Sequence, residues 1–275
     1  MQKLPALLLI TVCFFIQTAY IEGQSYDSFI APNDDFTLID TYYLGRAVSA
    51  NILTYYVPYT RNQEAVQYLN RICQTLVINS SGPPVFNGYH VMILDSNEYN
   101  AFASPGGHIF VTKKLVESAA SEDMLAAVIA HELAHIMLRH SVAIIKETKT
   151  ENELSSIASW AAGTAARFSN TARQAANYRN YVIKTVDTLM KNGYSQAQEF
   201  EADIEAIKIL ANAGYDPTAL IDVLKVLQQF QGSQRGGFYS THPSPYLRMA
   251  NLEKYQYPAR NTRQYRVTRF TNLKL

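Results

Sequence analysis

Apolar side chains recur along this chain at spacings that switch between helical and extended patterns. Helical spacing predicts helices over residues 34–56 and 62–78, separated by Pro58. After a break at residues 80–84, alternating spacing predicts strands over 85–94, 101–103 and 108–112, followed by a short helix near 114–118. The later part of the chain is predicted to form helices over 121–140, 195–213, 216–230 and a stretch ending at 253. The pattern favours a mainly helical α+β fold with a small sheet beside the helix over 121–140.

The helix predicted over residues 121–140 is apolar on nearly all sides, which is typical of a helix buried in a core. It nevertheless contains His131, Glu132 and His135 in the pattern H-E-x-x-H. Histidines four residues apart on a helix lie about 40° apart around its axis, so both imidazoles can bind one metal ion beside Glu132. The alternative is that the histidines only form hydrogen bonds. Because unpaired polar groups are costly in a core, a bound metal is the favoured explanation.

A catalytic zinc ion usually takes a third ligand from the protein and keeps one position for water. The metzincin class requires Gly at position 138 and His at 141, where this chain has Leu138 and Ser141, so that class is excluded. The best candidate for the third ligand is Glu199, with Asp203 one helical turn later to orient a ligand through a hydrogen bond. Glu201 competes for the role, but on a helix it lies about 200° from Glu199, so both cannot face the metal.

Charge and cysteine content narrow the class of protein. The 275 residues include 24 Lys and Arg against 23 Asp and Glu, and this balance argues against nucleic acid as the main partner. Lys3, an apolar run over residues 4–16 and small residues before Gln24 predict a secretory signal and export, with a membrane anchor as the alternative. If the signal is removed, Cys73 is the remaining cysteine, so no disulfide within the chain is expected.

These observations predict four regions along the chain. They are a signal peptide over residues 1–23, a helical N-terminal portion over 24–84, a catalytic domain over 85–255 and a basic C-terminal tail over 256–275. From Arg260 onward the tail contains four arginines, one lysine and no acidic residue, a composition typical of a solvated surface. The Ala-rich part of residues 147–195 is predicted to be a helix or lid packed near the site.

A tight turn precedes the third predicted strand. Gly106 and Gly107 form this turn, and the strand leaves it through His108, Ile109 and Phe110. Glycine permits close approach of another backbone, and a short strand beside a metal cleft can pair with an extended peptide. These five residues are therefore candidates for binding a peptide substrate.

Four motifs in the chain resemble those of the BepA/HtpX-type family of gluzincin metallopeptidases, which also includes the CAAX prenyl endopeptidases. The motifs are residues 102–107 (Phe-Ala-Ser-Pro-Gly-Gly), 131–135 (His-Glu-Leu-Ala-His), 199–203 (Glu-Phe-Glu-Ala-Asp) and 241–243 (Thr-His-Pro) with Arg248. The resemblance spans roughly residues 85–255. It is greatest to periplasmic BepA-like members, without the tetratricopeptide repeats that follow their catalytic domain, and it implies a zincin-type fold.

The resemblance also implies the roles of individual residues. One zinc ion per chain is implied, with ligands His131, His135 and Glu199. Glu132 is implied as the catalytic base and Asp203 as a support for the ligands, while His242 and Arg248 match positions near the metal. For His242, which precedes a proline in a Gly-rich region, three roles are open: a hydrogen bond to the oxyanion, occupation of the fourth zinc position, or a cap of the following helix.

The function implied is that of an exported zinc-dependent metalloendopeptidase. The expected partners are polypeptide substrates, namely misfolded or unassembled envelope proteins bound in an extended form along residues 108–112. Zinc and Glu132 are expected to activate the attacking water. Location in the periplasm or at the periphery of the membrane is expected. The alternative function is that of a zinc-stabilised chaperone or assembly factor whose peptidase centre is normally closed, because such a protein would carry the same motifs.

Overall fold

The computed structural model describes residues 38–82, 85–147, 179–180, 182–184, 186–187, 193–230, 241–242, 244–255, 257–258 and 263–273. The predicted signal peptide over residues 1–23 and the start of the first predicted helix lie outside the described residues. So does the Ala-rich stretch over residues 157–168 that was predicted to be a helix or lid. The described part is mainly helical with one small sheet, which confirms the predicted α+β class.

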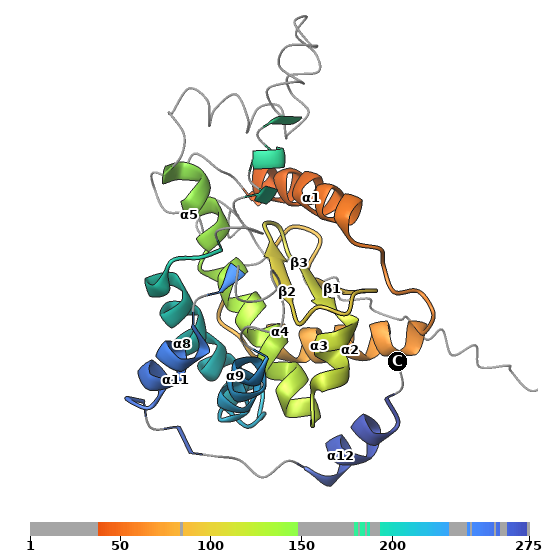
Figure 1. Ribbon diagram of the computed structural model, residues 1–275, viewed down its shortest axis with the longest axis vertical. Helices are drawn as coiled ribbons and strands as arrows, with labels where there is room; N and C mark the ends of the chain where they lie inside the picture. The colour runs from red at the N-terminus through yellow and green to blue at the C-terminus, as the bar shows by residue number, and fades with distance from the viewer. Residues whose placement is uncertain are drawn as a thin grey trace, which may run out of the picture.

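The sheet has three strands in the order β1-β3-β2 (Figure 1). β1 (His90–Leu94) runs parallel to β3 (His108–Thr112), and β2 (Ala101–Ser104) pairs with the other side of β3 in the antiparallel direction. The first strand begins later than the alternating pattern predicted. Asn87 and Gly88 have φ values of 68° and 77°, so the chain turns there and becomes extended only afterwards.

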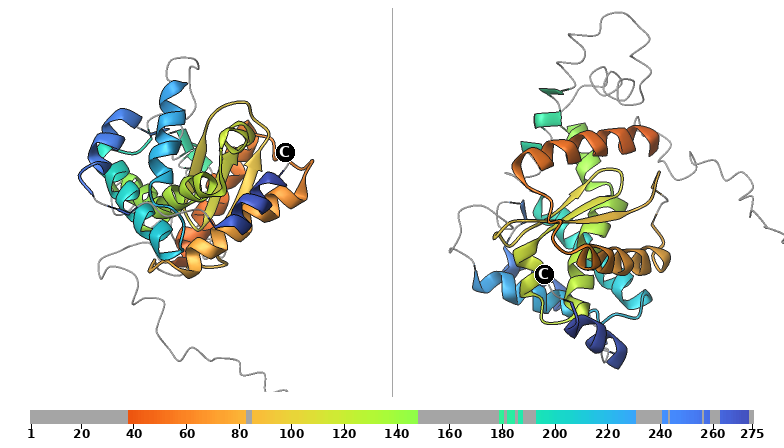
Figure 2. Two further views of the ribbon diagram at one scale, coloured as in Figure 1. Left: turned by 90° about the horizontal axis from the view of Figure 1, so that it is seen from below. Right: turned by 90° about the vertical axis from the view of Figure 1, so that its right-hand side faces the viewer.

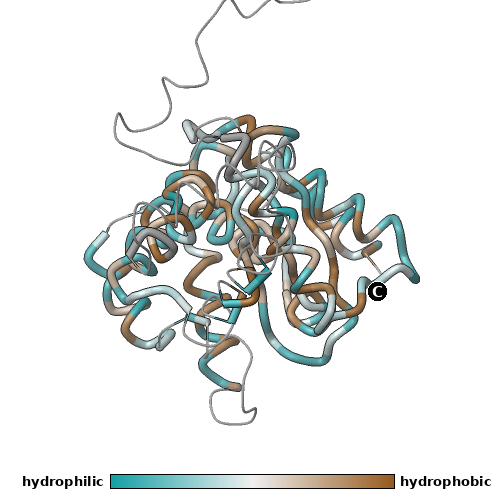
Figure 3. The backbone as a smooth tube through the Cα atoms, turned by 90° about the horizontal axis from the view of Figure 1, so that it is seen from above, coloured by the Kyte–Doolittle hydropathy of each residue, from teal (hydrophilic) through white to brown (hydrophobic). Residues whose placement is uncertain are grey.

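Helices cover both faces of the sheet, as the right-hand view of Figure 2 shows. α1 (Leu38–Tyr55) lies on one face, and α2 (Gln63–Ile78) and α4 (Glu122–Met137) lie on the other. Successive side chains of a strand point to opposite faces. In β3, Ile109 therefore packs in the core shared with α2 and α4, whereas Phe110 packs against α1. The hydropathy colouring of the backbone shows the apolar segments converging in the interior (Figure 3).

α4 follows the short helix α3 (Lys113–Ser118) and passes through the centre of the molecule (Figure 1). Ser121 is its N-cap and accepts a hydrogen bond from the backbone N–H of Met124 at 3.2 Å. Every residue of α4 is buried, as the apolar pattern predicted. The helix ends earlier than predicted because Arg139 has a φ of 56°, and a new helix, α5 (His140–Glu147), begins at the next residue.

Two later helices, α8 (Gln196–Asn212) and α9 (Ala219–Gln229), pack beside α4, and α11 (Pro245–Leu252) packs against α8 and α9 (Figure 1). α8 begins with a capping box between Ser195 and Gln198. α9 begins later than the helix predicted over residues 216–230. Oδ1 of Asp216 accepts hydrogen bonds from the backbone N–H and the hydroxyl of Thr218, which closes a turn, and the helix begins after that turn.

The basic C-terminal tail contains a last helix, α12 (Gln264–Thr271). The expectation that its arginines are solvated is wrong for Arg266, whereas the side chain of Arg269 is 45% exposed. Arg266 is 4% exposed, with its Nη1 3.1 Å from Oδ1 of Asp123, and Arg269 pairs with Glu122. These two acids form the first turn of α4 and are themselves buried. The tail therefore neutralises negative charge at the N-terminal end of the central helix.

No helix among the described residues is both long enough and apolar enough to cross a bilayer.

Candidate metal centre and active site

The two histidines of the H-E-x-x-H pattern lie on α4, and Glu199 reaches them from α8, which packs alongside. His131 is 3% exposed, and His135 and Glu199 are fully buried. The four-residue spacing on α4 puts both imidazoles on the side that faces α8. The structure thus brings together three side chains that the sequence predicted as metal ligands.

The distances between these side chains fit a small tetrahedral metal ion. Nε2 of His131 lies 3.1 Å from Nε2 of His135 and 3.4 Å from Oε2 of Glu199, and Nε2 of His135 lies 3.3 Å from Oε1 of Glu199. Two donor atoms that are each about 2.0 Å from one tetrahedral zinc ion lie about 3.3 Å apart. Two imidazoles and one carboxylate are also a common donor set of catalytic zinc. The residues therefore fit a zinc ion.

The electrostatics of the site favour a cation between the three side chains. Burial would raise the pKa of the Glu199 carboxyl, but His242 and Arg248 hold it well below its usual range. Burial and Arg248 oppose a charge on His131, yet Asp203 and Glu199 raise the pKa of this imidazole to about 9. A positive charge is therefore stabilised at this point, as a metal site requires.

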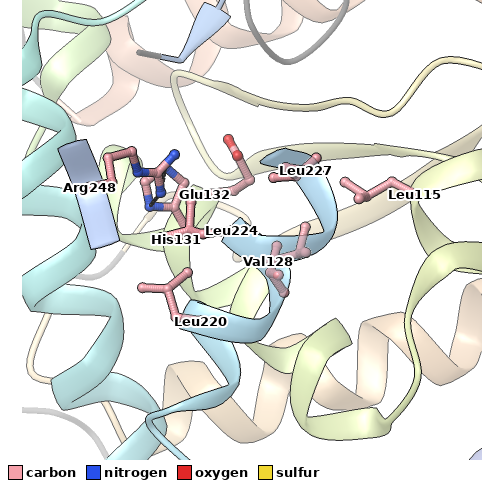
Figure 4. Close-up of a pocket in the computed structure, with 9 residues that line it drawn as sticks. Leu115, Val128, His131, Glu132, Leu220, Leu224, Leu227 and Arg248 are labelled. Atoms are coloured by element: carbon pink, nitrogen blue, oxygen red, sulfur yellow. Dashed lines mark hydrogen bonds between the residues drawn. The ribbon is translucent and has the colours of Figure 1, made fainter. Parts of the chain in front are cut away.

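Asp203 and Arg248 contact the candidate ligands directly, and Nη2 of Arg248 lies 3.3 Å from Nε2 of His131. Oδ1 of Asp203 lies 3.1 Å from Nδ1 of His131, which leaves Nε2 of that ring for the metal. Arg248 donates from Nε to Oδ2 of Asp203 at 2.8 Å, and its Nη1 lies 3.0 Å from Oε2 of Glu199. Figure 4 shows Arg248 beside His131. Both residues thus lie where the resemblance implied.

Glu132 lies on the same helix as the two histidines but is turned away from Arg248 (Figure 4). It is 1% exposed, and its Oε2 has no hydrogen-bond partner among the described residues. Burial raises the pKa of this carboxyl, although the charge of His242 acts in the opposite direction. A small pocket next to Glu132 and His131 is walled by apolar side chains of α3, α4 and α9, namely Leu115, Val128, Leu220, Val223, Leu224 and Leu227.

His242 lies inside the site. Its Nδ1 is 2.7 Å from Oε1 of Glu199, and its Nε2 is 3.7 Å from Oε1 of Glu132. His131, His135, Glu199 and His242 each offer one atom, and these four atoms all lie within 4.8 Å of one another. The side chain is 1% exposed, and the N-cap position of the following helix, α11, is occupied by Ser244.

Two further residues at the site were not predicted from the sequence. Tyr194 stacks on the ring of His135, with 3.8 Å between the ring centroids and 16° between the planes. His140 lies on another side of His135, with its Nδ1 2.9 Å from Nδ1 of that ring. On an unbroken helix His140 would lie about 140° from His135, and only the positive φ of Arg139 brings it back. The spacing of His135 and His140 in the sequence therefore did not predict this contact.

The competing third ligand, Glu201, points away from the metal-binding atoms. Its side chain is 65% exposed, and its Oε2 lies 3.3 Å from Nε2 of His140. As helical geometry predicted, Glu199 and Glu201 therefore point to different sides of α8. Glu199 faces α4, and Glu201 reaches toward α5 at the surface.

The prediction that an extended peptide pairs with the backbone of β3 is wrong. β3 is the central strand, and both sides of its backbone are already paired, with β1 and with β2. An extended peptide cannot add to His108, Ile109 or Phe110 as a further strand. Gly106 and Gly107 instead lie where other backbone segments of the chain pack closely against them. A Cβ on Gly107 would lie 2.4 Å from the carbonyl oxygen of Gly88, so glycine is needed there.

Comparisons with known proteins agree with this site. The family model described as "Peptidase family M48" matches residues 62–256. The chain is 29% identical over 187 residues to the beta-barrel assembly-enhancing protease of Escherichia coli (strain K12), an alignment that covers 67% of this chain and 37% of that protein. It is 29% identical over 172 residues to the mitochondrial metalloendopeptidase OMA1 of Saccharomyces cerevisiae, covering 60% and 46%. The metalloprotease LoiP of Escherichia coli is 27% identical over 183 residues, covering 66% and 67%.

The geometry predicts which carboxylate of α8 holds the metal. Glu199→Gln replaces an anionic ligand by a neutral amide, so the protein should lose most of its zinc. Glu205→Gln is the matched control, because Glu205 lies on the same helix, is 22% exposed and pairs with Lys208, outside the cluster of proposed ligands. Metal analysis of the purified proteins should give about one zinc per chain for the control and much less for Glu199→Gln. Retention of zinc by Glu199→Gln would overturn the choice of ligand.

Proposed function

The chain belongs to peptidase family M48, a family of metallopeptidases, and from this membership we propose a zinc-dependent endopeptidase that cleaves extended or misfolded polypeptides. One observation carries the proposal. Oε1 of Glu132 lies 3.7 Å from Nε2 of His242, a member of the cluster with His131, His135 and Glu199, and Oε2 of Glu132 has no hydrogen-bond partner among the described residues. A base in this position can act on a water bound at the same site.

Each residue of the proposed site has a distinct role in peptide hydrolysis. Zinc held by His131, His135 and Glu199 would polarise the peptide carbonyl and lower the pKa of a water molecule. Because burial raises its pKa, Glu132 is a stronger base than an exposed carboxylate, so it takes the proton of the attacking water. It then passes this proton to the leaving amine. Asp203 keeps the lone pair of His131 Nε2 directed at the metal by accepting the hydrogen bond of Nδ1.

We place the extended substrate along β2 instead of β3. The outer side of β1 is already used, because Asn70 bonds both backbone groups of Val91 and the backbone N–H of Tyr59 donates to the carbonyl of Ile93. β2 is the other edge strand of the sheet, and it packs against α4. A peptide at this edge would run past Glu132. The apolar pocket beside Glu132 favours an apolar side chain of the substrate next to the cleaved bond.

The surroundings of His242 support a closed resting state of this centre. Its ring lies among the three proposed ligands and within 2.7 Å of one of them, so it is placed to be a fourth ligand where water would otherwise bind. We therefore propose that His242 holds the peptidase off until it is displaced. The alternative function, a zinc-stabilised chaperone or assembly factor, shares this closed centre and differs only in whether the centre opens to cleave.

The natural substrates are proposed to be misfolded or unassembled envelope proteins. The support is similarity to a relative named as a beta-barrel assembly-enhancing protease, together with the predicted signal over residues 1–23. In an exporting host, the mature protein should begin between Tyr20 and Ser25, because the apolar run ends before those residues. N-terminal sequencing tests this, and a mature protein that still begins at Met1 would contradict cleavage of a signal.

The role of Glu132 is tested by Glu132→Gln, which keeps the size of the side chain and removes the base. Zinc content and melting temperature should be preserved, while cleavage of an unfolded protein substrate should fall by roughly 10²- to 10⁴-fold. Glu205→Gln, a change of the same type outside the site, should cleave at the normal rate. A Glu132→Gln variant with normal turnover would exclude the proposed mechanism, and a wild-type protein that binds zinc but cleaves nothing would favour the chaperone.

The role of His242 is tested by His242→Ala. Removal of a blocking ligand should raise basal cleavage about tenfold, which corresponds to about 1.4 kcal/mol in favour of the open state. His90→Ala is the control, because His90 is exposed on β1 outside the site. A fall of roughly 10²- to 10³-fold would show instead that His242 stabilises the oxyanion. An unchanged rate per zinc-loaded molecule would remove His242 from the site.

A further inference from the structure

The two ring nitrogens of His135 face different parts of the molecule. Nε2 lies 3.1 Å from Nε2 of His131 and 3.3 Å from Oε1 of Glu199, on the side where the metal is proposed. Nδ1 lies 2.9 Å from Nδ1 of His140, and Nε2 of His140 lies 3.3 Å from Oε2 of Glu201. A continuous row of polar contacts therefore leads from the metal centre, through two imidazoles, to a carboxylate at the surface.

The chemistry of the last group determines where the protons lie in this row. A carboxylate such as that of Glu201 only accepts hydrogen bonds, so Nε2 of His140 carries a proton. In a neutral imidazole the other nitrogen is then an acceptor, so Nδ1 of His140 accepts from a proton on Nδ1 of His135. That proton in turn leaves the lone pair on Nε2 of His135. This is the tautomer that a metal ligand requires at the nitrogen facing His131 and Glu199.

The local fold holds the members of the row in place. The left-handed conformation of Arg139 separates α4 from α5 and returns His140 to the side of His135, where it is 3% exposed. Glu201 lies two residues after the ligand Glu199, so α8 supplies both a metal-binding carboxylate and the carboxylate that ends the row. The stacked ring of Tyr194 covers a face of His135 and limits its rotation.

We propose that His140 and Glu201 are positioning residues of the metal centre, which fix the orientation and the tautomer of His135 through a hydrogen-bonded row that ends at the protein surface. The inference rests on the proposed metal site. It assigns to Glu201 a part in metal binding that differs from that of a ligand. It also gives a buried histidine outside the H-E-x-x-H pattern a defined chemical role.

The size of the expected effect follows from the contacts. Loss of a hydrogen-bond partner of a metal-ligating histidine typically lowers metal affinity by about 10- to 100-fold. His140 is buried and contacts the ligand directly, so its replacement should fall in that range. Glu201 is mostly exposed, and an amide in its place can still accept a hydrogen bond. Glu201→Gln should therefore retain most of the affinity.

Two variants at position 140 separate hydrogen bonding from packing. The amide oxygen of His140→Asn lies at a position similar to that of Nδ1 and can accept from His135, whereas His140→Leu fills the space with no acceptor. Zinc affinity is measured by titrating the metal-free full-length proteins against a chromophoric chelator. His140→Asn should bind within a few fold of wild type, and His140→Leu should bind about 10- to 100-fold more weakly.

Val142→Ala is the control for loosening of α5, because Val142 is buried on this helix but does not belong to the row. It should lower the melting temperature without changing zinc affinity. Nitrogen-15 spectra of the zinc-loaded wild-type protein give a second readout, which should show protons on Nδ1 of His135 and on Nε2 of His140.

Three results would overturn the proposal: normal zinc affinity of His140→Leu, equal losses in the Asn and Leu variants, or a proton on Nδ1 of His140 in the spectra. A different set of results is expected if the proposed metal site itself does not exist. In that case the wild-type protein would not bind zinc tightly, and Glu199→Gln would change nothing.

Discussion

The constraint on which this structure depends is the burial of two carboxylates, Glu199 and Asp203, one turn apart on α8. An isolated charge in a protein interior is strongly unfavourable, so each must be matched by a partner with good geometry. Arg248 reaches both of them, and His131 lies between them. The close packing of α4, α8 and α11 is therefore fixed by charge as well as by shape. Removing Arg248 or either acid would leave an uncompensated charge in the core.

The same principle operates at the other end of α4. Its first turn carries Glu122 and Asp123, which are favourable near the positive end of the helix dipole but are buried in this fold. Tyr68 and Tyr215 donate hydrogen bonds to Glu122 at 2.6 Å and 3.0 Å, and the arginines of α12 supply the opposite charge. A helix that holds a metal site needs a fixed position along its axis. Charged contacts at both ends of α4 provide it.

The sequence predicted those features that depend on residue type and local spacing. Apolar periodicity located β3 and most of the described helices, but not α5 or α12, and two motifs located His131, His135 and Glu199. The prediction failed where long-range pairing decides the outcome. The order of the strands, which places β3 in the centre, is set by the connections between strands and has no signature within the strand itself. The burial of Arg266 likewise depends on acids far away in the sequence, so composition alone suggested a solvated tail.

The segments before the ligand helix and before His242 are joined, and this limits how the site can open. The backbone N–H of Tyr194 donates to the carbonyl of Thr241 at 3.2 Å, and Gly193 approaches the same carbonyl so closely that a Cβ would lie 1.9 Å from its oxygen. Tyr194 also covers the face of His135. A backbone movement that withdraws His242 must therefore either break this contact or carry Tyr194 along and uncover a metal ligand. A rotation of the His242 side chain alone would keep the backbone contact between Tyr194 and Thr241, but it would break the contact between Nδ1 of His242 and Oε1 of Glu199.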